Sequence, residues 1–216
     1  MKLFLYLKFP SYFSPVKAKI LDTATEHFLN LGFKSVTMDD LAEQLGISKK
    51  TIYSHFNNKT ELVRECTLGL FHKIANGIDC ICKEDKNPIE ELYEIKRFAL
   101  LNLKNEKSSP QYQLKKYYPQ IYGTLHKKQF ELFKDCVRIN ILKGMEQGIY
   151  RENLDVDFVT RIYFAGMTSL KDESIFPRQQ FAILPLMDDY LEYHLRGITT
   201  SEGRNTLKTV INSNQD

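Results

Sequence analysis

The stretch that decides the fold runs from Ile20 to Val63 and reads ILDTATEHFLNLGFKSVTMDDLAEQLGISKKTIYSHFNNKTELV. Its apolar residues recur at spacings of three and four, which indicates amphipathic helices. Gly32 stands where a C-terminal helix cap belongs, and Gly46 ends the short helix that follows. The stretch therefore predicts three helices and the beginning of a fourth.

Polar residues mark where these helices begin. Thr37, followed three residues later by Asp40, resembles a capping box with Asp in place of the usual Glu. Ser48 is the expected cap of the third helix, and Asn58 with Glu61 the expected start of the fourth.

Two short helices joined by the turn Leu45–Ser48 have the arrangement of a helix-turn-helix. Gly46 permits the tight turn, and Ile52 and Phe56 lie four apart, where both can face inward. The other side chains of the third helix then project outward as donors for phosphates and base edges. These are Lys50, Thr51, Tyr53, Ser54 and His55.

Charge is distributed in a way that suits a polyanionic partner at one end. The chain carries a formal charge of +3, and its first 60 residues hold eight lysines and five acidic residues. A chance fluctuation of three charges would give the same difference, so charge alone does not decide the partner.

The remainder of the chain keeps helical spacing. Helices are expected from Asn58, from Pro88, from Pro119 to about Gly148, from Asp155, from about Arg178 to Arg196 and from about Glu202 to Ile211, with a polar break over 104–110. The prediction is an all-α protein with nine or ten helices.

The motifs LGF, TMDDLA, GISKKTIYSHF and NKTEL together closely resemble the N-terminal signature of the TetR family of transcriptional regulators. The resemblance covers about a fifth of the chain. It implies a helix-turn-helix DNA-binding domain over 16–60 and a larger helical ligand-binding and dimerisation domain over 61–216. Residues 1–15 are expected to be a disordered or wrongly assigned N-terminal extension.

The resemblance also implies a set of DNA contacts. Thr37 would bond a phosphate, Lys59 would hold another at a helix N-terminus, and Lys17 and Lys19 could add further contacts. Lys50 departs from many members, which have Gly there. The expected DNA-binding residues are Thr37, Ser48, Lys49, Lys50, Thr51, Tyr53, His55 and Lys59.

The resemblance implies a homodimer that binds a palindromic operator on double-stranded DNA. A small-molecule inducer would release the protein from the DNA, and no other cofactor and no metal is expected. The expected effector pocket comprises Phe98, Tyr112, Tyr117, Tyr118, Tyr122, Phe133 and Phe164. The expected dimer interface comprises Ala165, Gly166, Phe181, Leu184, Met187, Leu191 and Leu195, for which packing inside one subunit is the alternative.

Other classes of function find less support. The chain has no Gly-rich phosphate loop, HExxH, CxxC or nucleophilic serine motif, so an enzyme is not expected. A helical protein-interaction module or an activator would use the same helix-turn-helix. The apolar run Leu3–Leu7 is too short for a signal peptide or a membrane span, so a cytoplasmic, nucleoid-associated protein is expected. The four cysteines are expected to act as small apolar side chains rather than as a disulfide framework.

Overall fold

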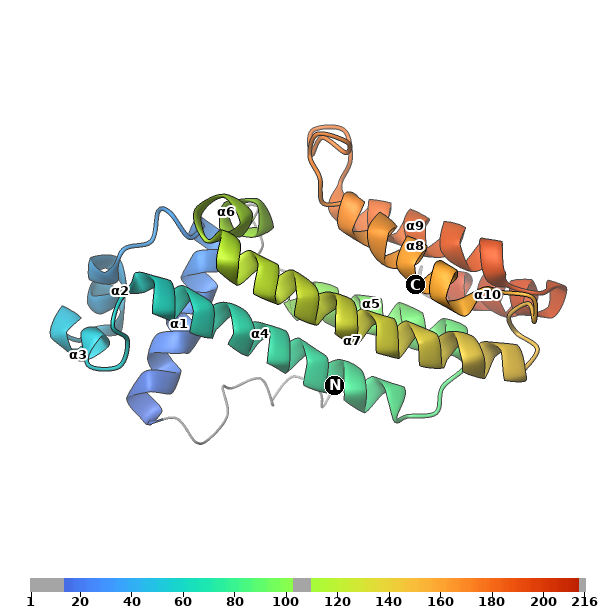
Figure 1. The fold of residues 1–216 in the computed structure, drawn as a ribbon, viewed down its shortest axis with the longest axis horizontal. Coiled ribbons are helices and arrows are strands. Elements are labelled where there is room, and N and C mark those ends of the chain that lie inside the picture. Colours follow the sequence, from blue (N-terminus) through green and yellow to red (C-terminus); the bar gives the residue numbers. More distant parts are fainter. Residues whose placement is uncertain (1–13, 103–109, 214–216) are drawn as a thin grey trace. The chain divides into compact units, whose positions relative to one another are not determined.

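A computed structural model describes residues 14–102 and 110–213, and these residues form ten α-helices (Figure 1). The expected all-α fold is confirmed. The helices are α1 (Pro15–Leu31), α2 (Met38–Leu45), α3 (Lys49–Tyr53), α4 (Lys59–Cys82), α5 (Pro88–Asn102), α6 (Pro110–Tyr117), α7 (Pro119–Glu146), α8 (Val156–Ser169), α9 (Ile183–Ile198) and α10 (Ser201–Ser213). Of the expected N-terminal extension, residues 1–13 lie outside the described part of the chain.

The structure differs from the sequence-based expectation at two helices. Helix α6 was not expected, because it has eight residues and buries only Pro110 and Leu114, which gives a weak periodic signal. The expected start of α9 near Arg178 was wrong, because the helix begins at Ile183. Pro185 explains the observed start at Ile183, because proline fits the first turn of a helix, where its missing N–H is not needed.

The chain divides into two compact units. The first consists of Met1–Gly77 and Leu101–Gln129, and the second of Ile78–Leu100 and Phe130–Asp216. The expected domain boundary near residue 60 stays a prediction. Among the described residues, no helix is both long enough and apolar enough to span a bilayer.

One apolar core holds the first unit together. It joins the first three helices to the start of α4, to α6 and to the first part of α7. Its buried members include Ile20, Leu21, Phe28, Leu41, Leu45, Ile52, Phe56, Leu62, Leu114, Ile121 and Leu125.

A buried polar side chain, Asn140, organises the core of the second unit. Its Nδ2 donates to the carbonyl oxygen of Pro88 over 2.9 Å and to Oε1 of Glu91 over 2.8 Å. Its Oδ1 accepts from the hydroxyl of Tyr150 over 3.1 Å. Glu91 also lies 3.7 Å from Nζ of Lys143. These bonds connect α5, α7 and the segment after α7 without leaving the amide unsatisfied.

His194 is a second buried polar group in this unit. Its ring stacks on Tyr163 with centroids 3.9 Å apart, and its Nε2 is buried with no hydrogen-bond partner in the described chain. Burial lowers the pKa of His194 from its ordinary value of 6.5 to about 4. The imidazole is therefore neutral in the folded protein at neutral pH.

The His194 environment predicts a loss of stability in mild acid. The unfolded chain takes up a proton near pH 6.5 and the folded chain only near pH 4, so stability falls as the pH is lowered between these values. The contribution amounts to up to about 3 kcal/mol. Urea unfolding at pH 7 and pH 4.5 should show a smaller difference in His194→Phe, which keeps a ring against Tyr163 but cannot titrate. An equal loss in both proteins would contradict this origin.

Candidate DNA-binding site

The second helix of the helix-turn-helix, α3, is held by the inward side chains of Ile52, which belongs to it, and Phe56, which lies three residues beyond its end. Ile52 is 0% exposed and Phe56 is 1% exposed, and both belong to the core of the first unit. Gly46, which ends α2, has the left-handed backbone conformation with φ of 64° that the turn requires. With these residues fixed, the rest of α3 faces solvent.

Three of the expected DNA contacts lie at the beginning of α3. Ser48 caps the helix by accepting from the backbone N–H of Thr51 over 3.0 Å, and the two hydroxyls lie 2.9 Å apart. Lys49 pairs with Asp39 of α2 over 2.9 Å. Both partners of this pair are exposed, so a phosphate can take the place of Asp39 at little cost.

Lys50, Tyr53 and His55 complete the outward face. Lys50 is exposed, and its side chain makes no hydrogen bond or ion pair with any described residue, whereas its backbone carbonyl accepts from the N–H of Ser54 over 2.9 Å. Tyr53 is 44% exposed although it is large and mostly apolar. His55 is half-buried beside Phe56, with ring centroids 6.4 Å apart.

Thr37 begins α2 with the capping box that the sequence predicted. Its Oγ1 accepts from the N–H of Asp40 over 3.1 Å, and Asp40 Oδ2 accepts from the N–H of Thr37 over 2.8 Å. The hydrogen bonds from Thr37 lower the pKa of Asp40, which keeps the carboxylate ionised. Because the Thr37 hydroxyl also interacts with the Asp40 carboxylate, a phosphate would take the place of that carboxylate as its acceptor.

Lys59 is the first residue of α4. Asn58 accepts from the N–H of Glu61 over 2.9 Å, so the expected cap is confirmed. Lys59 Nζ reaches the carbonyl oxygen of Lys34 over 3.4 Å, and partial burial lowers its pKa. A cation at the N-terminus of a helix is repelled by the positive end of the helix dipole. A bound phosphate would offset this repulsion.

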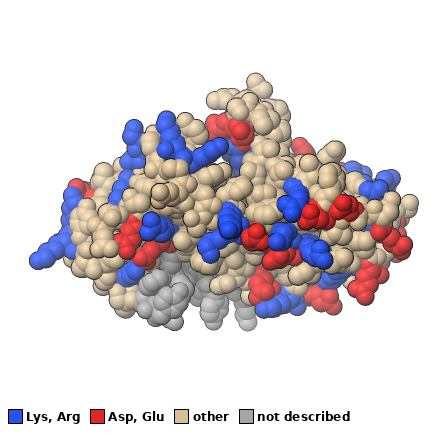
Figure 2. Space-filling view, in the orientation of Figure 1, with Lys and Arg blue, Asp and Glu red and all other residues tan. Residues whose placement is uncertain are grey.

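Lys17 is engaged within the protein. Its Nζ forms an ion pair with Glu65 over 2.8 Å and lies 5.0 Å from the centroid of the Phe56 ring. It therefore helps to hold the end of the helix-turn-helix against α4. Figure 2 shows Lys and Arg side chains protruding over the part of the surface where Figure 1 labels α2 and α3.

The expected effector-pocket residues fall into the two compact units. Tyr112, Tyr117, Tyr118 and Tyr122 belong to the first, where Tyr112 and Tyr117 are exposed. Phe98, Phe133 and Phe164 belong to the second. There the Phe133 and Phe164 rings lie 5.2 Å apart in an aromatic cluster. The effector pocket expected from these seven residues stays a prediction.

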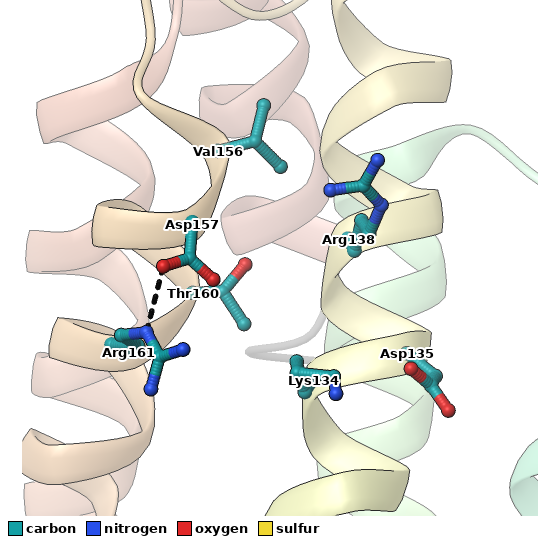
Figure 3. A pocket seen from close by; sticks show the side chains of 7 residues that line it. All are labelled: Lys134, Asp135, Arg138, Val156, Asp157, Thr160 and Arg161. Carbon is teal, nitrogen blue, oxygen red and sulfur yellow. Dashed lines mark hydrogen bonds and ion pairs between the residues drawn. The ribbon is translucent and has the colours of Figure 1, made fainter.

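A surface pocket of about 380 Å³ lies between α7 and α8 in the second unit, and none of the expected residues lines it (Figure 3). Three cationic side chains line it, together with Val156, Asp157, Thr160 and Asp135, the last of which points away from α8. The cations are Lys134, Arg138 and Arg161.

The cations of this pocket differ in their partners. Arg161 Nε donates to Asp157 over 2.7 Å, and Lys134 pairs with Glu131 over 2.8 Å. The Arg138 guanidinium makes no ion pair or hydrogen bond within the described residues, although its charge helps to lower the pKa of Asp157. The pocket thus holds one guanidinium without a direct partner, beside the carboxylates of Asp135 and Asp157.

Thr160 is the one buried polar side chain of the pocket. It is 1% exposed, and its Oγ1 has no hydrogen-bond partner among the described residues. Elsewhere in α8 the hydroxyls of Thr168 and Ser169 donate to the carbonyl oxygens four residues earlier, each over 2.9 Å. This pocket was not predicted from the sequence, because it forms only where two separate helices, α7 and α8, pack side by side.

The expected dimer-interface residues are of two kinds. Met187, Leu191 and Leu195 are buried within a single chain, which matches the alternative of packing inside one subunit. Ala165, Phe181 and Leu184 are exposed, with Phe181 preceding α9 and not part of it. A side chain at Gly166 would overlap Tyr190, whose hydroxyl donates to the carbonyl oxygen of Ile162 over 3.1 Å.

A further set of exposed apolar residues on α8 and α9 was missed by the sequence analysis. Phe158 and Ile162 lie four apart on α8, and Tyr193 lies on α9. The i, i+4 spacing of Phe158 and Ile162 could have indicated a second apolar face on α8, because Val159 and Tyr163 already supply the buried face of that helix.

A capped helix with a buried apolar side and an outward face of lysine, tyrosine and hydroxyl groups defines a helix-turn-helix DNA-binding regulator. Residues 20–66 match the family model described as bacterial regulatory proteins, tetR family. These residues form a DNA-binding region of the TetR family. This confirms the resemblance drawn from the sequence and the expectation of a regulator rather than an enzyme.

Comparison with known proteins extends the likeness beyond the DNA-binding region. The chain is 24% identical over 203 residues to the HTH-type transcriptional repressor KstR2 of Mycolicibacterium smegmatis, covering 90% of this chain and 96% of that one. It is 31% identical over 81 residues to IcaR of Staphylococcus epidermidis, a negative regulator of the biofilm operon icaADBC, covering 37% and 42% of the two chains. A transcriptional regulator from Cytophaga hutchinsonii has the same fold, with a TM-score of 0.69 at 14% identity over 87% of this chain and all of that one.

Proposed function

We propose that this protein is a transcriptional repressor that binds a palindromic operator as a homodimer and is released by a small-molecule effector. The observation that carries the proposal is the orientation of α3. Its Ile52 is buried, as is Phe56 just after its end, while Lys50 and Tyr53 project into solvent. Repression, rather than activation, is supported by the names of KstR2 and IcaR. Such a protein would act in the cytoplasm, on the nucleoid.

Each DNA contact has a proposed role that follows from its place. Thr37 and Lys59 would bind phosphates from the beginnings of α2 and α4. Ser48, Lys49, Lys50 and Thr51 would approach the major groove with the N-terminal end of α3, and Tyr53 and His55 would contact the flanking backbone. Lys50 has a side chain long enough to bind either a phosphate or the acceptor edge of guanine.

Dimerisation is proposed through the exposed side chains of α8 and α9. Two recognition helices must lie one turn of DNA apart, about 34–36 Å, to read both halves of a palindrome. Phe158, Ile162, Leu184 and Tyr193 offer apolar area for this purpose, whereas Met187, Leu191 and Leu195 are occupied within their own subunit.

The pocket between α7 and α8 is proposed as the effector site, with an organic anion as its ligand. The support is chemical: the Arg138 guanidinium lines the pocket with no direct ion pair or hydrogen bond within the described residues, and the buried hydroxyl of Thr160 lacks a partner among them. Both groups can bind a carboxylate or phosphate. An aromatic cluster formed by Phe130, Phe133 and Phe164 adjoins this pocket, because Arg161, which lines the pocket, lies 5.6 Å from the centroid of the Phe130 ring. The cluster could accept an apolar part of the same molecule.

The DNA-binding proposal predicts the effect of a double substitution, Tyr53→Ala with Lys59→Ala. Affinity for the operator should fall on the order of a hundredfold, and the dependence of log Kd on log salt should become shallower by about one phosphate contact. Fluorescence anisotropy with DNA from upstream of the gene measures both. Lys208→Ala, at an exposed position of α10, is the matched control and should bind like the unmodified protein. Failure of the unmodified protein to bind that DNA and a random-sequence pool would refute the proposal.

The dimer proposal predicts different outcomes for two exposed isoleucines of the second unit. Ile162, 51% exposed on α8, and Ile139, 63% exposed on α7, are each replaced by Glu. A buried unpaired carboxylate in the interface should weaken the dimer by roughly 2 kcal/mol or more in Ile162→Glu only. Sedimentation velocity at several concentrations gives the result. Dissociation in Ile139→Glu alone would place the interface elsewhere.

The effector proposal predicts that Thr160→Val changes stability and anion binding in opposite senses. Removing a buried unpartnered hydroxyl should raise the free energy of unfolding by up to about 1 kcal/mol. The same change should weaken binding of succinate or inorganic phosphate about tenfold, as should Arg138→Gln. Calorimetric titration and urea unfolding provide the two readouts, with Lys208→Gln as control. Unchanged anion binding in both pocket variants would contradict the assignment.

A further inference from the structure

Two cysteines that are distant in the sequence lie together in the second unit. Cys82 is the last residue of α4 and Cys136 lies within α7, and their sulfur atoms are 3.6 Å apart. Both are half-buried and neither is in a disulfide. Cys80 is two residues from Cys82 but is exposed, and Cys66 is buried.

The two thiols of this pair have different chemical properties. The hydrogen bond from Cys136 lowers the pKa of Cys82, and the cation of Lys143 acts in the same direction. The same hydrogen bond and burial raise the pKa of Cys136. Cys82 is therefore the better nucleophile, while Cys136 retains its proton.

We propose that Cys82 and Cys136 form a site of reversible disulfide modification, for which the oxidant is a hydroperoxide. The Cys82 thiolate attacks the terminal oxygen of the hydroperoxide, forming an S–O bond as the O–O bond breaks, and the alkoxide leaves as an alcohol after taking a proton. Cys136 then attacks the sulfur of the resulting sulfenic acid, and the hydroxyl leaves as water with the thiol proton. Two thiols are oxidised by two electrons, and one hydroperoxide is reduced to an alcohol and water.

The geometry requires only a small movement of the two side chains. A disulfide has an S–S length of about 2 Å, so the sulfur atoms must approach by about 1.5 Å from their observed separation of 3.6 Å. Both residues belong to the same compact unit, so the bond does not require the two units to rearrange.

The other two cysteines are internal controls. Cys66 Sγ donates to the carbonyl oxygen of Leu21 over 3.7 Å, and burial raises the pKa of its thiol to about 12, so it should resist oxidation. Cys80 is accessible, but on a helix it points to a different face from Cys82.

The test is oxidation of the purified full chain with hydrogen peroxide, followed by alkylation of remaining thiols and peptide mapping without reductant. Trypsin should release a cross-linked pair of peptides, 74–83 and 135–138, that dithiothreitol separates. Because peptide 74–83 contains both Cys80 and Cys82, the assignment depends on the variants. The cross-link should persist in Cys80→Ser and fall at least tenfold in Cys82→Ser and Cys136→Ser.

A sulfenic-acid probe supplies a second readout. In Cys136→Ser, dimedone should label Cys82, because the resolving thiol is absent. No cross-link in the unmodified protein, a cross-link that survives Cys82→Ser, or dimedone on Cys80 in place of Cys82 would overturn the proposal. Circular dichroism of each serine variant confirms that it is folded. The readout is a covalent bond, so the result does not depend on whether the protein binds an operator.

Discussion

The burial of Ile52 and Phe56 is the constraint on which the DNA-binding surface depends. Helix α3 has only five residues, and a helix of that length is not stable alone in water. Removing these two side chains from water contributes roughly 3–6 kcal/mol, enough to hold so short a helix on the core. Their burial also fixes the directions of Lys50 and Tyr53. The orientation of the recognition face thus follows from the packing of Ile52 and Phe56 on the core. The exposed side chains of that face need few contacts with the rest of the protein.

The electrostatics of the same region leave its cations available. Lys49 is paired with an exposed aspartate that a phosphate can replace, and Lys50 makes no ion pair within the described residues. Lys17, by contrast, is committed to Glu65 and to the face of Phe56, so its charge supports the packing. The lysines near the helix-turn-helix therefore differ in role according to whether they have an acidic partner and how exposed that partner is.

The DNA-binding region was largely predictable from sequence because its determinants are local. Thr37 with Asp40, Ser48, Gly46 and the Ile52–Phe56 spacing each act over a few residues, and the structure confirms their roles in the backbone. The second unit was less predictable because its features depend on residues far apart. The apolar spacing of α9 could not show whether Leu191 and Leu195 face a partner or their own core. The pocket around Thr160 and the pair of Cys82 with Cys136 arise only when helices pack. Pro185 was a local signal for the start of α9 that could have been used.

The hydrogen bonds of Asn140 have a consequence for how this protein can change over evolution. Replacement of Asn140 by an apolar residue leaves the carbonyl of Pro88, the carboxylate of Glu91 and the hydroxyl of Tyr150 each with one partner fewer. A single substitution at position 140 therefore destabilises the fold through three lost hydrogen bonds. Positions 91, 140 and 150 should for that reason be conserved together or change together. Most surface positions of the same unit bear no such restriction. Descendants of this protein could therefore acquire new binding surfaces while these three positions stay unchanged.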